Sequence, residues 1–471
     1  MQEKIEWVKA HIMDILIWGV IGFFALLYIS LLFNYNIWTD EAFTLGLLKG
    51  NIKEIIEGTA IDVHPPLYYF YAKVFYVITN GSLWVQKFIA IIPQIGTYLL
   101  IATVFRKKFG DTATLLSLIF FTCIPCTMEF SVQVRMYSLA LFFVTLCGIY
   151  AHEAYMDNTL KAWVWVTIGA LGAAYTHYFA FVSVIVIVGF LFLAILFSKR
   201  ELLKNWFIAA ACMIIGYLPW AKSFIIQVTR VRENYWIPEI TPEVIWSYFV
   251  WTFDLELEPG VVYGVLGLLV IAGVIILVQI IRKKEGADIV ALFAMLVPTM
   301  TAVLGVIISL SKSPIYRDQY IFPSLMLLAI FFGLAFRKIN GKILIPVCAF
   351  LLFVGAVQYK ECFRQEYKST YVPQTMEFFE QNLSEDDYIV YNWDTFDFIY
   401  ELYFPVEQMA YIEDFDFSQD FNTVWFLNTK WNPEIDPAVL EANNLSMDII
   451  GLYGIEHNEF DLYMIYHNEY K

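Results

Sequence analysis

The residues of this sequence best suited to chemistry are ionisable side chains that interrupt long apolar stretches or stand at their ends. They are of two kinds. Carboxylates can take a proton from a hydroxyl group, and cations can hold an anionic leaving group. The set consists of Asp40, Glu41, Asp62, His64, Glu129, Arg135, His177, Arg230, Arg232 and Arg317. For any one of them, a helix cap is an equally good interpretation.

The composition of the chain indicates the solvent around this set. Of 471 residues, 59% are apolar and only 16% are charged, which excludes a soluble single-domain enzyme. The net charge of −15 argues against binding to nucleic acid. Residues 359–471 carry 23 Asp and Glu but only 5 Lys and Arg. We therefore predict a membrane domain over 1–358 and an acidic domain over 359–471.

Apolar runs between basic clusters predict about eleven transmembrane helices. The clusters around Arg106, Lys199, Arg282 and Arg337 face the cytoplasm by the positive-inside rule. The first run continues to Phe33 without a cleavage site, so we interpret it as a retained helix. With an odd number of spans, the N-terminus is cytoplasmic and the C-terminus extracytoplasmic. The predicted spans are 14–33, 84–104, 112–129, 136–155, 161–176, 178–197, 205–222, 260–281, 288–310, 319–336 and 342–358.

Residues 65–80 are apolar but do not fit this count, because a crossing there would move Arg106 to the outside. Pro65 and Pro66 start a helix, and the tyrosines that follow are typical of a membrane interface. We interpret residues 34–83 as an outer loop with juxtamembrane helices. Every residue of the ionisable set then lies at the outer side, where a shared functional cavity is favoured over chance.

The chain has no motif of a soluble catalytic domain, neither a phosphate-binding glycine loop nor a nucleophile elbow. The acidic segment alternates between predicted helices and strands, which indicates a small α/β domain. Helices are predicted near 373–383, from Asp394 and from Asp436; strands are predicted over 387–392, 409–413, 423–429, 447–455 and 460–468.

Chemistry at an outer membrane surface is restricted, since ATP and nucleotide sugars are absent there. Activated groups must arrive attached to lipid. A sugar on a polyprenyl phosphate needs a carboxylate to deprotonate the acceptor hydroxyl and cations to hold the departing phosphate. The outer set contains both.

Five segments in this order resemble the C-type membrane glycosyltransferases, in the family 39 group that includes protein O-mannosyltransferases. These segments are Trp38–Thr44, Asp62–Tyr69, Val134–Leu139, Tyr175–Phe179 and Tyr316–Tyr320 with Pro323. The resemblance covers residues 14–340. It implies an α-helical polytopic membrane protein with juxtamembrane helices in the first outer loop and a polyprenyl-phosphate-linked sugar as donor.

Transferred residue by residue, the resemblance implies Asp40 as catalytic base and Glu41 as its neighbour in the catalytic pair. Among the cations, it implies His64, Arg135 and Arg317 as ligands of the donor phosphate. We also expect Asp62, His177 and Tyr320 to contact the substrate, with a core or interfacial role as the alternative for His177. A divalent cation at His64 is an open expectation, and no metal ligand set is assigned.

Two other functions compete with this one: a transporter or flippase of lipid-linked sugars, and a membrane-anchored assembly protein. A transporter should show polar residues at mid-span and broken helices in paired halves, and the sequence shows no convincing repeat. We expect a multi-pass protein of a bacterial cell membrane. Its sugar remains open, and its acceptor could be an envelope glycan, a lipid-linked glycan or a protein hydroxyl.

Overall fold

The structure is a computed structural model, and it describes residues 2–33, 37–230, 237, 239–252, 259–282, 286–311, 313–368, 371–393, 397–429, 434–455 and 458–468. The chain divides into two compact units. One holds residues 1–32 and 50–363, and the other holds residues 33–49 and 364–471. The fold is mostly helical, as predicted, with one small sheet in the second unit.

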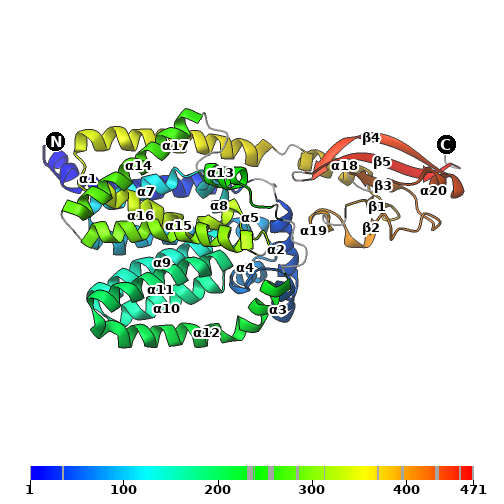
Figure 1. The fold of residues 1–471 in the computed structure, drawn as a ribbon. Coiled ribbons are helices and arrows are strands. Elements are labelled where there is room, and N and C mark those ends of the chain that lie inside the picture. Colours follow the sequence, from blue (N-terminus) through cyan, green and yellow to red (C-terminus); the bar gives the residue numbers. More distant parts are fainter. Residues whose placement is uncertain are drawn as a thin grey trace. The chain divides into compact units, whose positions relative to one another are not determined.

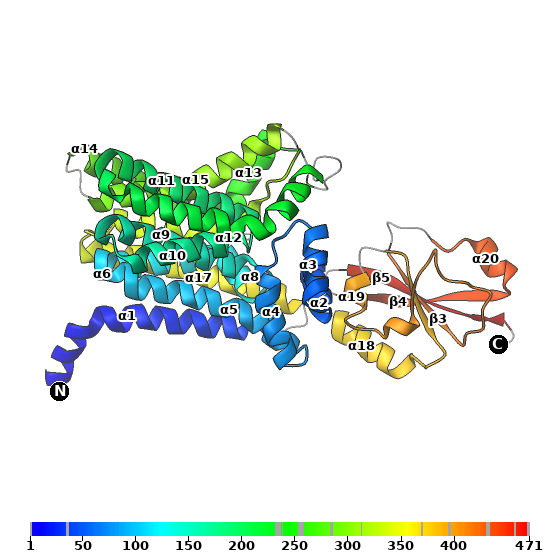
Figure 2. The same ribbon diagram turned by 90° about the horizontal axis from the view of Figure 1, so that it is seen from below.

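The first unit is a bundle in which α9, α10, α11 and α12 pack side by side, while α1 packs along α5 and α7 (Figures 1 and 2). Its helices are α1 (Gln2–Ser30), α3 (Ile52–Ile61), α4 (Leu67–Ile78), α5 (Leu83–Leu100), a π-helical turn (Ile101–Phe105), α6 (Arg106–Phe109), α7 (Asp111–Thr122), α8 (Cys126–Val132), α9 (Tyr137–Asp157), α10 (Leu160–Ala174), α11 (Tyr178–Ser198), η2 (Arg200–Leu202), α12 (Leu203–Arg230), α13 (Pro242–Trp251), α14 (Pro259–Arg282), α15 (Gly286–Ser311), η3 (Asp318–Ser324), α16 (Leu325–Ala335) and α17 (Gly341–Lys368). The last residues of α17 belong to the second unit.

Within the described residues, nine helices are long and apolar enough to cross a membrane, and the bent pair α7–α8 would make ten. The sequence predicts about eleven spans for the whole chain, and the two counts differ at two of the predicted spans. The span predicted over 161–176 is α10, which has 15 residues. At 1.5 Å per residue it is about 22 Å long, short of the roughly 30 Å of a hydrocarbon core. The span predicted over 112–129 is broken after Thr122 by a bend of 76°.

Helix α4 accounts for the apolar segment 65–80. It has 12 residues, about 18 Å, so it is too short to cross a bilayer. Its turn towards α5 uses Asn80 and Gly81, both with positive φ. The prediction of a short helix in this segment is confirmed, and its length agrees with the prediction that it does not span.

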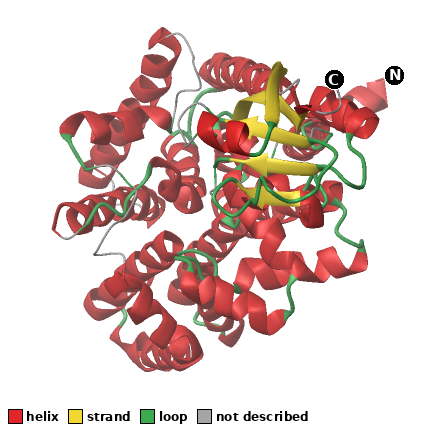
Figure 3. Cartoon of the chain, turned by 90° about the vertical axis from the view of Figure 1, so that its right-hand side faces the viewer, coloured by secondary structure: helices red, strands yellow, loops and turns green. Residues whose placement is uncertain are grey.

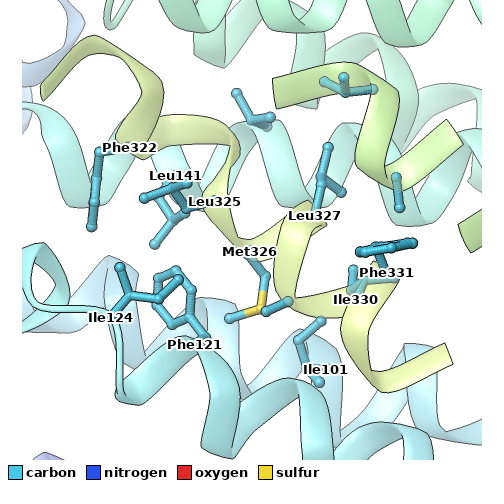
Figure 4. Packing of buried hydrophobic residues seen from close by; sticks show 14 of the residues in the cluster. Ile101, Phe121, Ile124, Leu141, Phe322, Leu325, Met326, Leu327, Ile330 and Phe331 are labelled. Carbon is cyan, nitrogen blue, oxygen red and sulfur yellow. The ribbon is translucent and has the colours of Figure 1, made fainter. Parts of the chain in front are cut away.

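The core of the bundle lies around α16, whose residues are almost all buried. Figure 4 shows Met326 and Ile330 of this helix among Ile101, Phe121 and Leu141 of its neighbours. The approach to α7 is close: a Cβ added to Gly333 would lie 3.1 Å from the backbone nitrogen of Ser117. This closely packed centre supports the loops at the helix ends.

The second unit holds one small sheet, drawn in yellow in Figure 3. It is a mixed sheet of five strands in the order β2-β1-β3-β5-β4. Strand β1 is parallel to β2 and β3, and β5 is antiparallel to β3 and β4. Its elements are α2 (Thr39–Lys49), α18 (Tyr371–Asn382), β1 (Tyr388–Tyr391), α19 (Asp397–Tyr400), η5 (Val406–Gln408), β2 (Met409–Tyr411), β3 (Val424–Asn428), α20 (Pro437–Ala442), β4 (Leu445–Ile455) and β5 (Asn458–His467).

The predicted order of helices and strands in this unit is confirmed. Asp436 is the N-cap of α20, with its carboxylate accepting from the backbone N–H of Ala438 at 2.8 Å. Asp394, the other predicted cap, lies outside the described residues. The unit also takes in α2, which the sequence pattern assigns to the membrane domain; Lys49 of α2 pairs with Glu401 at 3.4 Å.

Candidate active site

Asp62 and His64 lie in the short connection between α3 and α4. Asn51 is the N-cap of helix α3, and its side chain forms a capping box with Glu54; the helix ends at Ile61 with Asp62 as its C-cap. Pro65 and Pro66 follow, and α4 starts at Leu67 with Pro66 as its N-cap. Nδ1 of His64 lies 2.6 Å from Oδ2 of Asp62. This connection therefore presents a carboxylate and an imidazole as a hydrogen-bonded pair.

Arg135 approaches this pair from the turn between α8 and α9. Its side chain is only 2% exposed, and its Nη2 lies 3.4 Å from Nε2 of His64. A guanidinium can only donate, so Nε2 accepts and Nδ1 carries the proton that His64 donates to Asp62. The three side chains form a continuous polar chain from Arg135 through His64 to Asp62.

The polar contacts of His64 and Arg135 keep Asp62 ionised. Burial by itself raises the pKa of the Asp62 carboxyl, but its contacts with His64, with the backbone of Val63 and with Arg135 outweigh burial and lower the pKa to about 2. Asp62 is thus a stable anion between two nitrogen-bearing side chains.

His177 adds a second imidazole. It is the N-cap of α11, and its Nδ1 accepts from the backbone N–H of Phe179 at 3.2 Å. The ring centroid of His177 lies 6.2 Å from His64, 5.7 Å from Tyr137 and 5.1 Å from Tyr320. Burial, followed by the nearby His64 and Arg135, holds the pKa of His177 well below its usual value of 6.5. His177 is therefore neutral, and it caps its helix as well as facing the site.

The turn η3 brings Tyr320 to this cluster. The Tyr320 ring stacks on Phe179 at 5.0 Å, and the Tyr316 ring meets the same Phe179 at 5.2 Å. Arg317 stands between these tyrosines in sequence and is partly exposed, with its Nε 3.5 Å from Oδ1 of Asp318. The structure thus gathers Asp62, His64, Arg135, His177 and Tyr320 around shared contacts, with Arg317 on the adjoining turn.

Asp40 and Glu41 belong to the second unit, in the first turn of α2. Glu41 is 3% exposed, and its Oε2 accepts from the backbone N–H of Trp38 at 3.2 Å, which is a capping contact at a helix start. Asp40 is half-buried beside it. The capping interpretation of the acidic pair therefore applies to Glu41.

The other residues of the outer set have structural contacts or fall outside the described residues. Glu129 accepts from Gln133 at 3.0 Å, and Arg230 donates to the backbone oxygen of Asp62 at 3.2 Å. Arg232 lies outside the described residues. Sequence reasoning missed Tyr137, which contacts His177, and Gln227, a lone amide in the apolar end of α12 that reaches the carbonyl of Asp62.

Comparison with known proteins agrees with this geometry. Residues 63–221, which include every residue of the cluster except Asp62 and Tyr320, match the family model described as dolichyl-phosphate-mannose-protein mannosyltransferase. The structure is similar to that of ArnT from Cupriavidus metallidurans bound to undecaprenyl phosphate, with a TM-score of 0.66 and 11% identity over 96% of this chain and 98% of that chain. For ArnT of the same organism in the apo state the TM-score is 0.64, with 10% identity over 94% and 97% of the two chains. A search of curated proteins by sequence gave no significant match.

The chain has the fold of a C-type membrane glycosyltransferase. The resemblance read from the sequence is thereby confirmed, and it carries the description of the chain as a membrane protein with transmembrane helices. The C-type fold also explains why the cluster forms at helix ends, since the connections α3–α4, α8–α9 and α10–α11 together with η3 supply its members.

The described residues around His64 offer only part of a ligand set for the expected divalent cation. Among the residues that the structure describes, no three His, Cys, Asp or Glu side chains come together. Asp62 and His64 would supply two protein ligands, and the hydrogen bond between them occupies one nitrogen and one oxygen. The cation remains a prediction, which activity after chelation would test.

Proposed function

We propose that this protein transfers a sugar from a polyprenyl-phosphate donor to an acceptor hydroxyl at the outer face of a cell membrane. The acceptor attacks the anomeric carbon directly, so the configuration is inverted, and Asp40 is the general base. The observation that carries the proposal is the buried Arg135 beside His64 in a fold similar over nearly its whole length to a glycosyltransferase crystallised with undecaprenyl phosphate.

The cations support an anionic donor. A buried guanidinium stays charged and can bind two oxygens of a phosphate at once. Arg135 lies in the turn before α9, while Arg317 is the partly exposed N-cap of η3 and is able to meet a lipid phosphate. Because phosphate is a good leaving group, these contacts replace the general acid that a glycoside hydrolase needs.

The three carboxylates differ in how well each can accept a proton from the acceptor hydroxyl. Asp62, whose pKa is lowered to about 2, binds a proton too weakly to take one efficiently from a hydroxyl near neutral pH. Glu41 caps α2 through its contact with Trp38. These two assignments favour Asp40 as the base, with Asp62 as an electrostatic partner of His64.

Purified variants in lipid nanodiscs, given a polyprenyl-phosphate sugar and candidate acceptors, test this proposal. We expect Asp40→Asn to lose nearly all transfer while retaining undecaprenyl phosphate binding, and Glu41→Gln to lose less. Arg135→Ala and Arg317→Ala should weaken binding by about tenfold to a hundredfold, since a charge-assisted hydrogen bond contributes roughly 1.5–3 kcal/mol.

Asp436→Asn, which changes a cap in the other part of the second unit, is the matched control and should retain full transfer. An active Asp40→Asn enzyme, or a product with retained configuration, would contradict the mechanism. Inside-out membrane vesicles with donor added to one side test the outer-face assignment.

A further inference from the structure

Gln227 is a polar side chain without a role in the mechanism above. It lies three residues before the end of α12, in the apolar sequence Phe224–Val228, and is 1% exposed. A buried amide must have its donors and acceptor satisfied, or it costs stability. Its partners therefore show what the end of α12 is built to hold.

The amide nitrogen of Gln227 holds the end of α3. Nε2 lies 2.7 Å from the backbone oxygen of Thr59 and 2.7 Å from that of Asp62, with the oxygen of Ala60 at 3.3 Å. The last carbonyls of a helix have no partner within the helix. The two N–H groups of Gln227 thus replace the next helical turn, and they fix the backbone of Asp62 directly.

The amide oxygen of Gln227 holds the start of α11. It accepts a hydrogen bond from the hydroxyl of Tyr178, and that hydroxyl accepts from Nε1 of Trp220 at 3.1 Å. Tyr178 directly follows His177. One side chain of α12 therefore joins the segment of Asp62 and His64 to the segment of His177.

We propose that Gln227 is a positioning residue. It holds Asp62 and His64 at the positions from which His64 contacts Arg135 and faces His177. This inference rests on the proposed sugar transfer. The contact between His64 and Arg135 is 3.4 Å, near the limit of a hydrogen bond, so a small displacement of the α3–α4 connection would break it. Small misplacement of binding groups lowers rates strongly, even when the chain stays folded.

The test uses full-length protein in nanodiscs and three substitutions. Gln227→Leu removes the amide at similar volume, and we expect kcat for transfer to fall at least tenfold. Gln227→Glu keeps the shape but turns a carboxylate towards three carbonyl oxygens. We expect this variant to be impaired at neutral pH. Its activity should rise as the pH is lowered, because the protonated carboxyl regains one hydrogen-bond donor. A residue needed only for folding would not give this recovery.

Tyr175→Phe is the matched control. It removes a hydrogen bond of 2.8 Å to the backbone oxygen of Gly216 in the same α12, and it should leave kcat within about twofold, since no residue of the polar chain loses a partner. If Gln227→Leu does not fold, Tyr178→Phe removes the partner of the amide oxygen while the ring stays packed on Phe224.

The outcomes separate the two proposals. Wild-type kcat in Gln227→Leu or Tyr178→Phe, or no acid recovery in Gln227→Glu, overturns the positioning role and leaves the sugar transfer standing. A wild-type protein that transfers no sugar from a polyprenyl phosphate overturns the proposed function, and the positioning role with it. A loss in Tyr175→Phe equal to that in Gln227→Leu would show a general effect of α12 and also overturn the positioning role.

Discussion

His64 donates a hydrogen bond from Nδ1 to Oδ2 of Asp62 across 2.6 Å, two residues away along the chain. Residues at this spacing in a regular helix point away from each other. The connection between α3 and α4 brings them together because α3 ends at Ile61 and the two prolines delay the next helix. The pair is a product of the loop, and Arg135 completes it from a distant part of the sequence.

The first prediction concerns the charge of Asp62. Its pKa is lowered to about 2, so the stability gained from its ionised form is complete above about pH 4 and is lost as the pH falls through 2. His64→Gln removes the interaction that lowers the pKa of Asp62 most, so the pKa of Asp62 rises. We expect the acid loss of stability to begin at higher pH, by an amount on the order of 2 kcal/mol at pH 4.

Thermal unfolding in detergent between pH 3 and 7 measures this shift. Asp62→Asn combined with His64→Gln should remove it, because the titrating carboxyl is absent. A His64→Gln protein whose melting temperature follows the wild-type pH curve would contradict the assigned pairing.

The second prediction concerns His177, whose pKa is held well below 6.5 by burial and by His64 and Arg135. The unfolded chain binds a proton at this residue below pH 6.5 and the folded chain does not, so stability falls as the pH is lowered from 6.5. His177→Asn retains a good helix cap without a titrating group. We expect the melting temperature of this variant to fall less between pH 7 and 5.

Thr159→Asn is the control for this experiment, because it places the same side chain at the N-cap of α10 and removes no titrating group. It should reproduce the wild-type slope. Equal slopes for His177→Asn and wild type would mean that His177 titrates in the folded protein.

The sequence predicts the positions of Arg135 and His177 in the fold better than it predicts the number of spans. Arg135 and His177 divide apolar runs that are too long for one span, so their place at helix ends follows from length alone. The sequence predicts more spans than the described residues contain as long apolar helices, because apolar content does not reveal that α10 is short or that the run after Asp111 bends at Thr122. The role of Gln227 could not be predicted, because a single amide near the end of an apolar helix does not indicate which backbone carbonyls it will bind.

The third prediction concerns the bent pair α7–α8, which leads into the turn of Arg135. Gln94 of α5 donates to the backbone oxygen of Thr127 at 2.9 Å and accepts from Ser138 at 3.2 Å, so it holds both sides of that turn. Its Nε2 also lies 3.3 Å from the hydroxyl of Tyr98, which bonds to Tyr28. Gln94→Leu removes these three buried contacts and should cost about 2–4 kcal/mol.

Unfolding measured with Gln94→Leu, Ser138→Ala and the double variant checks this prediction. The double variant should lose less than the sum of the two single losses, since both remove the same contact. Strict additivity would show that the two side chains act independently.

The last prediction tests how tightly α15 supports the aromatic side of the site. Gly305 lies against the rings of Tyr316 and Phe179, and a Cβ there would stand 2.9 Å from Cε1 of Phe179 while meeting Tyr316 more closely still. Both rings belong to the cluster that holds Tyr320 beside His177. In a close-packed interior such an overlap forces the rings to move, at a cost of about 1–3 kcal/mol. We expect Gly305→Ala to lower sugar transfer at least fivefold, with a smaller loss of melting temperature.

Gly267→Ala in α14 is the control. Nothing lies within 4 Å of the new methyl group there, so the same chemical change should leave both sugar transfer and melting temperature unaltered. Equal transfer by the two variants would show that the site tolerates movement of Tyr316 and Phe179, and Tyr320 would then lose its place among the substrate contacts.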